Sequence, residues 1–232
     1  RLREQRITAL TAARDEPSAI AGNAFTRLVF GEEHPYGRLA TTATTREIDR
    51  DALAEFHQAH YRPHGSTLIL VGDVDPDVIH PQLARAFAEW TGRAPQPVKV
   101  NDAPGQDETR IYLIDKPGAA QSEIRIGHVG GARDHPEHFP LTVLNTIRGG
   151  SFTSRLNMNL RETHGYSYGA RSSFAMRRGA GPFMASSAVF TAVTDSAVVQ
   201  FFEELRRIRE EPVTQDDLER AKNYVALGMP RL

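Results

Sequence analysis

An arginine and two tyrosines lie close together in LRETHGYSYGARS, residues 160–172. Arg161 precedes Gly165, and Tyr166 and Tyr168 follow it. A guanidinium offers a planar pair of donors, and a phenol hydroxyl can donate to an oxyanion, so this pattern suits the binding of a peptide carbonyl. The pattern is also typical of a helix that ends at a glycine and leads into an aromatic strand. The spacing alone leaves both interpretations open.

Metal binding is the second chemistry to consider, because the chain has nine histidines. His57 and His60 share one face of an expected helix, and DHPEH at 134–138 gathers two more histidines with two carboxylates. Neither segment has the spacing that puts two imidazoles and a carboxylate on one helix face. We therefore expect no metal site in this chain. Thiolate metal sites and disulfides are excluded, since there is no cysteine.

The composition is that of an ordinary globular protein, with 40% hydrophobic and 25% charged residues. A net charge of −1 and the lack of a basic, aromatic-rich stretch argue against nucleic-acid binding. The compact apolar run LILV at 68–71 is far too short to cross a membrane. No signal peptide is visible, and the chain starts at Arg1 without a methionine, so we interpret it as a fragment or a processed form.

The elements that must position these residues can be predicted from periodicity, caps and breakers. Helices are expected over residues 1–16, 18–31, 44–62, 75–90, 139–147, 152–161 and 195–210, and from 214 onward, the third of them capped by Thr44 and Glu47. Strands are expected over residues 66–74, 110–115, 122–129, 167–176 and 181–190. Residues 93–109 are rich in proline, glycine and polar residues and are the predicted linker between residues 1–92 and 110–232. The expected fold class is α+β with two lobes.

Several stretches resemble the pitrilysin/insulinase family of zinc peptidases, which includes the mitochondrial processing peptidase. The most specific is VLNTIRGGSFTSRLNMNLRETHGYSYGARSSF at 143–174. The similarity continues through GPF at 181–183 and PVTQDDLERAK at 212–222, and HPYG at 34–37, FHQAHYRP at 56–63 and LILVGDV at 68–74 are similar to the latter part of a first family domain. The resemblance implies a clamshell of α+β domains, each a mainly antiparallel sheet flanked by helices.

In this family the active half carries an inverted zinc motif, His-x-x-Glu-His, and a third ligand glutamate on a later helix. The opposite half supplies an arginine and a tyrosine, which match Arg161 and Tyr168 here. The resemblance thus implies that these two residues contact the substrate carbonyl and the transition state. The resemblance also implies Tyr166 and Gly165 as substrate-binding residues. Tyr166 could share or take the role of Tyr168, and Gly165 would let the backbone turn between Arg161 and Tyr168.

This sequence departs from the active pattern, because it contains no His-x-x-Glu-His. The third-ligand position aligns with Leu2, which cannot bind a metal, and Glu4 is the nearby carboxylate. The resemblance therefore implies the inactive, Arg/Tyr-bearing type of domain, with no cofactor in this chain and zinc in a partner half.

We accordingly expect the substrate-binding half of a zinc metallopeptidase, inactive alone and forming a heterodimer with a zinc-bearing subunit or domain. Its substrate would be an unfolded peptide that lies as an extra strand against a sheet edge. The alternatives are a catalytically dead structural or assembly subunit, and a fragment of a single-chain active peptidase whose zinc motif lies upstream of Arg1. The compartment is left open, although the resemblance to bacterial members favours the periplasm.

Overall fold

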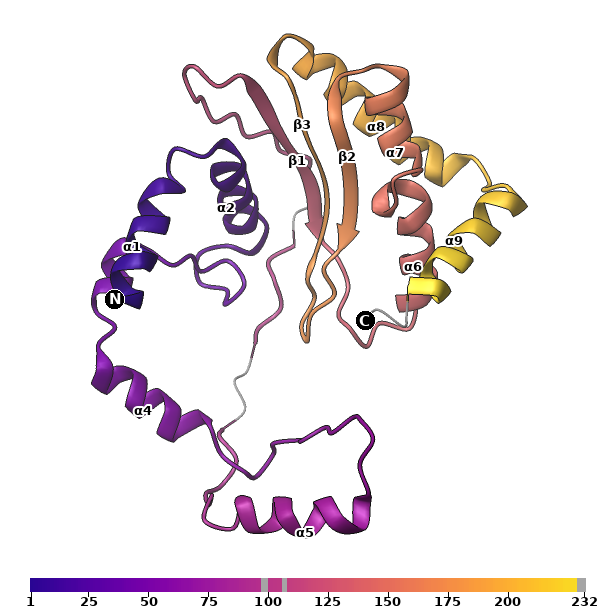
Figure 1. Ribbon diagram of the computed structural model, residues 1–232. Coiled ribbons are helices and arrows are strands. Elements are labelled where there is room, and N and C mark those ends of the chain that lie inside the picture. Colours follow the sequence, from indigo (N-terminus) through magenta and orange to yellow (C-terminus); the bar gives the residue numbers. More distant parts are fainter. Residues whose placement is uncertain (97–99, 106–107, 229–232) are drawn as a thin grey trace. The chain divides into compact units, whose positions relative to one another are not determined.

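The computed structural model describes residues 1–96, 100–105 and 108–228 (Figure 1). The chain forms two compact units, one of Arg1–Thr8 with Ala40–Lys99 and one of Ala9–Leu39 with Val100–Leu232. The fold class is α+β, as expected, with helices and an antiparallel sheet. The predicted domain division at residues 93–109 stays a prediction, and residues 97–99 and 106–107 of that segment lie outside the described residues.

The first unit contains the helices α3 (Thr42–Arg46), α4 (Arg50–His60) and α5 (Pro76–Ala86). The single helix predicted over 44–62 is therefore divided. The division occurs because Asp49 caps α4, accepting the Ala52 N–H at 2.8 Å. The predicted capping pair is also wrong, since Thr41 and Thr44 form the reciprocal capping box of α3.

Two predicted strands, residues 66–74 and 110–115, are not strands in the structure. A strand exists through its ladder of hydrogen bonds to a neighbour, and no described residue pairs with either run. Their apolar side chains consequently face solvent, with 91% of Val71 and 95% of Leu113 exposed. Both runs are apolar, but neither forms the predicted strand.

The second unit is built on a three-stranded antiparallel sheet, the sole sheet among the described residues. Its strands are β1 (Gln121–Val129), β2 (Ser167–Phe174) and β3 (Pro182–Phe190), in the order β1-β3-β2. Ser187 of β3 is paired with both Ile124 of β1 and Ala170 of β2. The sheet therefore has β2 as one outer strand and β1 as the other.

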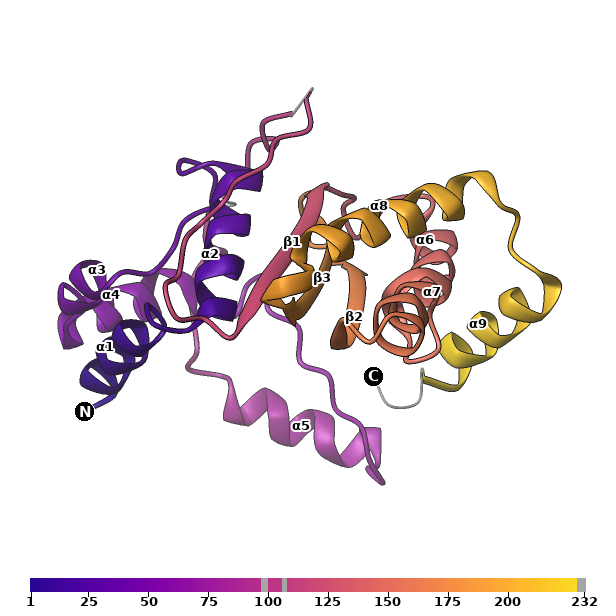
Figure 2. The same ribbon diagram turned by 90° about the horizontal axis from the view of Figure 1, so that it is seen from above.

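Helices cover the sheet of the second unit on both sides. Figure 2 shows α2 (Pro17–Phe30) beside β1, with α6 (His138–Asn145), α7 (Arg155–Asn157) and α8 (Thr194–Glu210) on the other side of the sheet. Two π-helical segments continue the helical path, η1 (Thr146–Gly150) after α6 and η2 (Met158–Thr163) after α7. The chain also contains α1 (Leu2–Ala12), the short 3-10 helix η3 (Thr191–Val193) and the final helix α9 (Gln215–Gly228).

The core lies between the sheet and the layer formed by α7, η2 and α8. Its side chains come from alternate strand positions and from one stripe of each helix, as amphipathic elements require. The buried apolar members of this core cluster are Ile124, Leu156, Leu160, Ala170, Phe183, Ala185, Val189, Ala197 and Phe201. This packing fixes η2 against β2, the two elements that carry the predicted site residues.

Candidate functional site

Arg161 lies near the end of η2, where the helical path stops. The N–H of Gly165 donates to the Arg161 carbonyl at 3.2 Å, and Gly165 has φ +63°, a left-handed conformation that glycine adopts without strain. The Arg161 guanidinium lies 4.6 Å from the centre of the Phe152 ring, with its Nε 3.3 Å from a carboxylate oxygen of Glu162. More than a third of the side chain stays accessible, so its donors can reach a ligand.

A β-bulge sets the direction of Tyr168. Ser167 is opposite Val189 and Ala170 is opposite Ser187, so three steps along β2 match two steps along β3. The extra residue changes which face the following side chains occupy. As a result Ala170 is buried in the core, whereas 83% of Tyr168 is exposed and its ring packs edge-on against Phe190, with the ring centres 6.4 Å apart.

Tyr166 occupies a different environment from Tyr168. It is partly buried, packs against the core cluster and stacks on His164 with ring centres 4.9 Å apart. Its backbone forms hydrogen bonds to η2 and to β3: the Tyr166 N–H donates to the Leu160 carbonyl, and the Tyr166 carbonyl accepts from the N–H of Phe190. Tyr166 is therefore a packing residue of the junction between η2 and the sheet. Tyr168 presents its ring to solvent.

Arg161 and Tyr168 have separate neighbours, and no contact between them is found among the described residues. Among the described residues, Arg161 contacts Phe152 and Glu162, and the ring contact of Tyr168 is with Phe190. Sequence reasoning missed Phe152 and Phe190. Phe152 stands inside the quoted motif, but Phe190 becomes a neighbour only through the register of β3 with β2.

A second group that the sequence analysis missed lies beneath β2. The guanidinium of Arg148 is 4.1 Å from the ring centre of Phe183, and it donates to Asn145 at 3.2 Å and to Ser172 at 3.4 Å. Burial lowers the pKa of Arg148 to about 10, because desolvation disfavours its charged form. The cation is held by an aromatic face and neutral acceptors.

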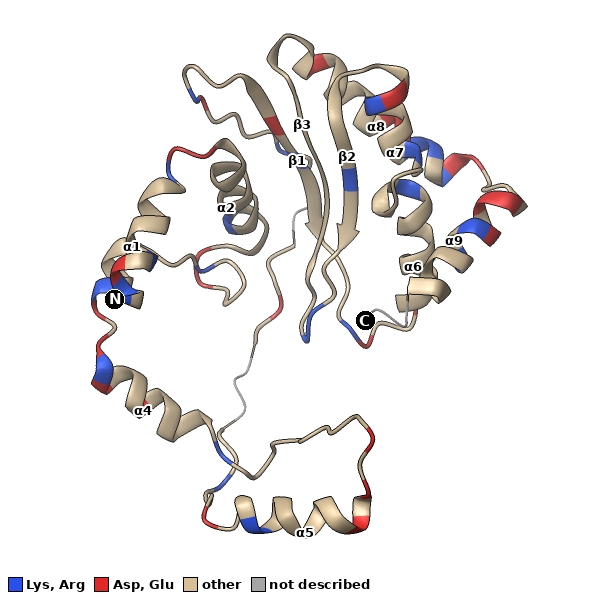
Figure 3. Cartoon of the chain, viewed as in Figure 1, with Lys and Arg blue, Asp and Glu red and all other residues tan. Residues whose placement is uncertain are grey.

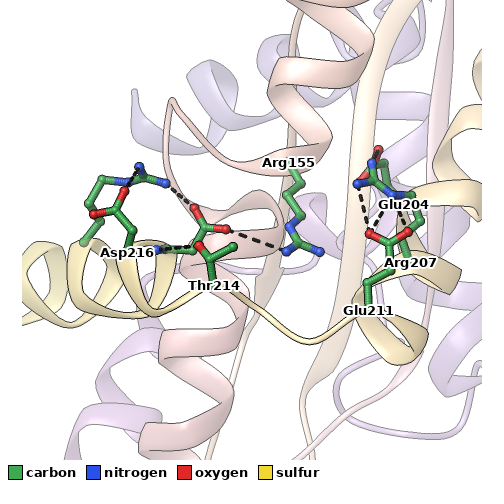
Figure 4. A network of polar contacts seen from close by, with 8 residues as sticks. Arg155, Glu204, Arg207, Glu211, Thr214 and Asp216 are labelled. Atoms are coloured by element: carbon green, nitrogen blue, oxygen red, sulfur yellow. Dashed lines mark hydrogen bonds and ion pairs between the residues drawn. The ribbon is translucent and has the colours of Figure 1, made fainter.

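A polar network connects the helices of the second unit (Figure 4). Glu204 of α8 is buried, and one of its oxygens accepts from Asn159 and from Arg207, each at 2.8 Å. Arg155 of α7 extends toward α9, where it lies 3.7 Å from Asp217. Opposite charges alternate along the solvent side of α8 and α9 (Figure 3). These pairs support the helix layer rather than forming a reactive site.

The described part of the chain contains no group of three or more His, Asp or Glu side chains able to hold a metal ion. His57 stacks on Tyr61 and His60 packs against Phe56. Leu2 is exposed, and Glu4 lies beside Arg3 with most of its side chain in solvent. The residues present therefore do not form a zinc site in this region. No helix in the described residues is both long enough and apolar enough to cross a membrane.

The family model and the similar proteins point to the same protein family. Residues 47–225 match the model of the peptidase M16 inactive domain. A protein of Mycobacterium tuberculosis named as an uncharacterized zinc protease is 26% identical over 224 residues, which cover 94% of this chain and 49% of that protein. The chain thus spans about half the length of the curated relatives it matches.

Two solved structures show the same fold. A peptidase M16 inactive domain from Pseudomonas fluorescens has a TM-score of 0.88 at 23% identity, covering 97% of this chain and 54% of that one. The periplasmic protease PqqL from Escherichia coli has a TM-score of 0.77 at 14% identity, covering 99% of this chain and 25% of that one. Chains with this fold therefore occur within longer polypeptides.

Proposed function

Because the chain belongs to the M16 peptidase family and matches its inactive domain, we propose that it is the non-catalytic, substrate-contacting half of a zinc peptidase. Relatives named as zinc proteases support a role in proteolysis. The metal would be held by a partner half, either a second chain or another part of a longer polypeptide. The substrate class is an unfolded peptide, which an enclosed two-half enzyme can admit.

The exposure of Tyr168 is the observation that supports this proposal best. A large aromatic side chain that is 83% exposed contributes little to the core of its own domain. The bulge that directs it outward interrupts the pairing of β2 with β3, and bulges are frequent at sheet edges and next to active sites. Arg161 likewise keeps its guanidinium near the surface, supported from one side by Phe152.

These two side chains suit one task. The Tyr168 hydroxyl would donate a hydrogen bond to the scissile carbonyl oxygen, and the bond would strengthen as negative charge develops there. Arg161 would donate two hydrogen bonds to a neighbouring backbone carbonyl and hold the peptide in register. Zinc in the partner half would supply the activated water and the Lewis acid.

The test is kinetic and uses the chain reconstituted with a zinc-bearing half, recognised by its His-x-x-Glu-His sequence. Tyr168→Phe keeps the ring and removes only the hydroxyl, so turnover of a fluorogenic peptide should fall about a hundredfold while thermal unfolding stays unchanged. Arg161→Ala should raise KM as well as lower kcat. Tyr166→Phe is the matched control and should retain activity.

Other results would assign the role differently. Loss of activity in Tyr166→Phe with full activity in Tyr168→Phe would move the role to Tyr166. Full activity in all three variants would favour the competing function, a structural or assembly subunit in which neither Arg161 nor Tyr168 contacts the substrate.

A further inference from the structure

The outer edge of β2 carries the backbone groups that a partner strand would use. Ala175, directly after β2, donates its N–H to the carbonyl of Pro182 of β3 at 2.9 Å, so the backbone N–H at this position faces β3. Bonded pairs alternate along an antiparallel ladder. Ala170 and Ser172 therefore direct their N–H and C=O groups away from β3, toward the free side of this outer strand.

Two asparagine side chains already occupy that side. The Ala170 N–H donates to Oδ1 of Asn157 at 3.0 Å. The Ser172 carbonyl accepts from Nδ2 of Asn145 at 2.8 Å, and the Ser172 hydroxyl donates to Oδ1 of Asn145 at 2.8 Å. An asparagine amide presents one donor side and one acceptor side, as a peptide unit does. The two side chains thus replace the backbone of a neighbouring strand.

The helical backbone closes the same edge sterically. A Cβ atom added to Gly149 would lie 2.6 Å from the Ser172 nitrogen, a distance that no side chain tolerates. The backbone of η1 therefore lies directly against β2 at Ser172. Ala170, Ser172 and Asn157 are each only 4% exposed, so the edge is buried within the domain. Figure 1 shows the helices α6 and α7 beside β2.

We propose that Asn145 and Asn157 form an amide lock that closes the β2 edge, so that a peptide does not extend this sheet at β2. Resting on the proposed function, this means that the substrate contacts the second unit through side chains such as Tyr168, whose ring stands on the exposed face. The sequence predicts that the peptide adds as an extra strand to a sheet edge, and that edge would then be one other than β2. Asn145 and Asn157 are positioning residues, because they hold the strand that carries Tyr168.

Amide hydrogen exchange on the wild-type chain tests the lock without any variant. The Ala170 N–H should exchange at least about a hundredfold more slowly than an unstructured amide, although it faces away from β3. Arg171, whose N–H faces β3, is the internal reference for a protected ladder amide. Exchange of Ala170 at the unprotected rate would overturn the proposal.

Two variants test the cause of the protection. Asn157→Ala should accelerate exchange at Ala170 and leave Arg171 protected. The double variant Asn145→Ala/Asn157→Ala removes both amides, so exchange at Ala170 should accelerate, although the backbone of η1 still lies against β2 at Ser172. A double variant that folds and keeps Ala170 protected would contradict the lock.

A peptide titration separates this inference from the proposed function. The fluorogenic peptide, which the isolated chain should not cleave, is added to labelled wild-type chain, and backbone amide signals are followed by NMR. Signals around Tyr168 should shift while the exchange rate of Ala170 stays constant. New protection at Ser172 on peptide addition would overturn the lock even if the peptide binds. Loss of all peptide effects with Ala170 still protected would leave the lock intact and remove the proposed function instead.

Discussion

Tyr166 and Tyr168 are two residues apart, yet one packs against the core and the other stands in solvent. Tyr166 stacks on His164 and contacts the core cluster, while 83% of Tyr168 is exposed. In a regular strand, side chains two positions apart share a face. The difference arises because Tyr166 precedes β2 and Tyr168 lies at the bulge between Ser167 and Ala170.

This relationship predicts that replacing tyrosine by alanine has unequal effects on stability at the two positions. Tyr166→Ala removes a partly buried ring and should lower the free energy of unfolding by about 2–4 kcal/mol. Tyr168→Ala removes an exposed ring and should change it by no more than about 0.5 kcal/mol. Urea unfolding of both variants measures the difference. Equal losses would show that Tyr168 packs as a structural residue.

Two glycines give a second matched pair. Gly165 has φ +63°, so Gly165→Ala should cost about 1 kcal/mol through backbone strain, although nothing lies within 4 Å of the added Cβ. Gly22 lies inside α2 and also has nothing within 4 Å, so Gly22→Ala should add up to about 1 kcal/mol. Thermal unfolding of the two variants should therefore shift in opposite directions. Two shifts of the same sign would contradict the left-handed role of Gly165.

Much of the fold follows from local sequence signals. The helix α8 carries an apolar stripe and β3 is a run of small and apolar residues, and both were predicted nearly to the residue. The two predicted strands that do not form are residues 66–74 and 110–115. Their β-type apolar character is a local property, but forming a strand depends on a neighbour that no pattern within the run identifies.

The site was predictable only in part. The motif drew attention to Arg161 and Tyr168, but the direction of Tyr168 depends on a bulge that appears only once β2 is aligned with β3. The sequence also gives no sign of the proposed lock formed by Asn145 and Asn157. Each asparagine reads as an ordinary helix residue, and its partner in β2 lies more than ten positions away along the chain.

The ion pair between Arg207 and Glu211 predicts a dependence of stability on pH. Hydrogen bonds from Arg207 lower the pKa of the Glu211 carboxyl group below its usual value, and the positive charge adds to the effect. A lowered folded pKa means that the stabilisation is present above the unfolded pKa of about 4.3 and is lost as the pH falls through the folded pKa. Wild type should therefore exceed Glu211→Gln in stability at pH 7 and converge with it in acid. Urea titrations at both pH values measure this, and a gap that persists in acid would speak against the ion pair.

The chain should hold no stoichiometric zinc when it is isolated. The expected third-ligand position is Leu2, and Glu4 is exposed beside Arg3. Elemental analysis after dialysis measures the metal content, and Glu4→Gln should leave it unchanged. One tightly held zinc per chain, lost in Glu4→Gln, would show that Glu4 is a ligand. Zinc lost instead on changing His135 or His138 would assign the site to the 134–138 cluster.

Limited proteolysis should cut first within the linker predicted at residues 93–109 or at its boundary. Trypsin cleaves after arginine, and both Arg93 and Arg110 are exposed and lie outside helices and strands. Because both arginines are accessible, the segment around each can bind in the active site of trypsin in an extended conformation. Arg148 is only 8% exposed within η1 and should resist until the second unit unfolds.

Arg93→Gln and Arg110→Gln provide the control for this cleavage. Each variant should remove one early fragment and leave the other. Because trypsin also cleaves after lysine and the linker contains Lys99, a triple variant that adds Lys99→Gln should delay the first cut altogether. On the C-terminal side the linker is held by His34, whose Nε2 lies 3.0 Å from the Asn101 carbonyl oxygen. His34→Ala should therefore speed cleavage after Arg110 and not after Arg93. Early fragments ending at Arg148 or Arg155 would instead mean that the segment carrying the site opens before the linker does.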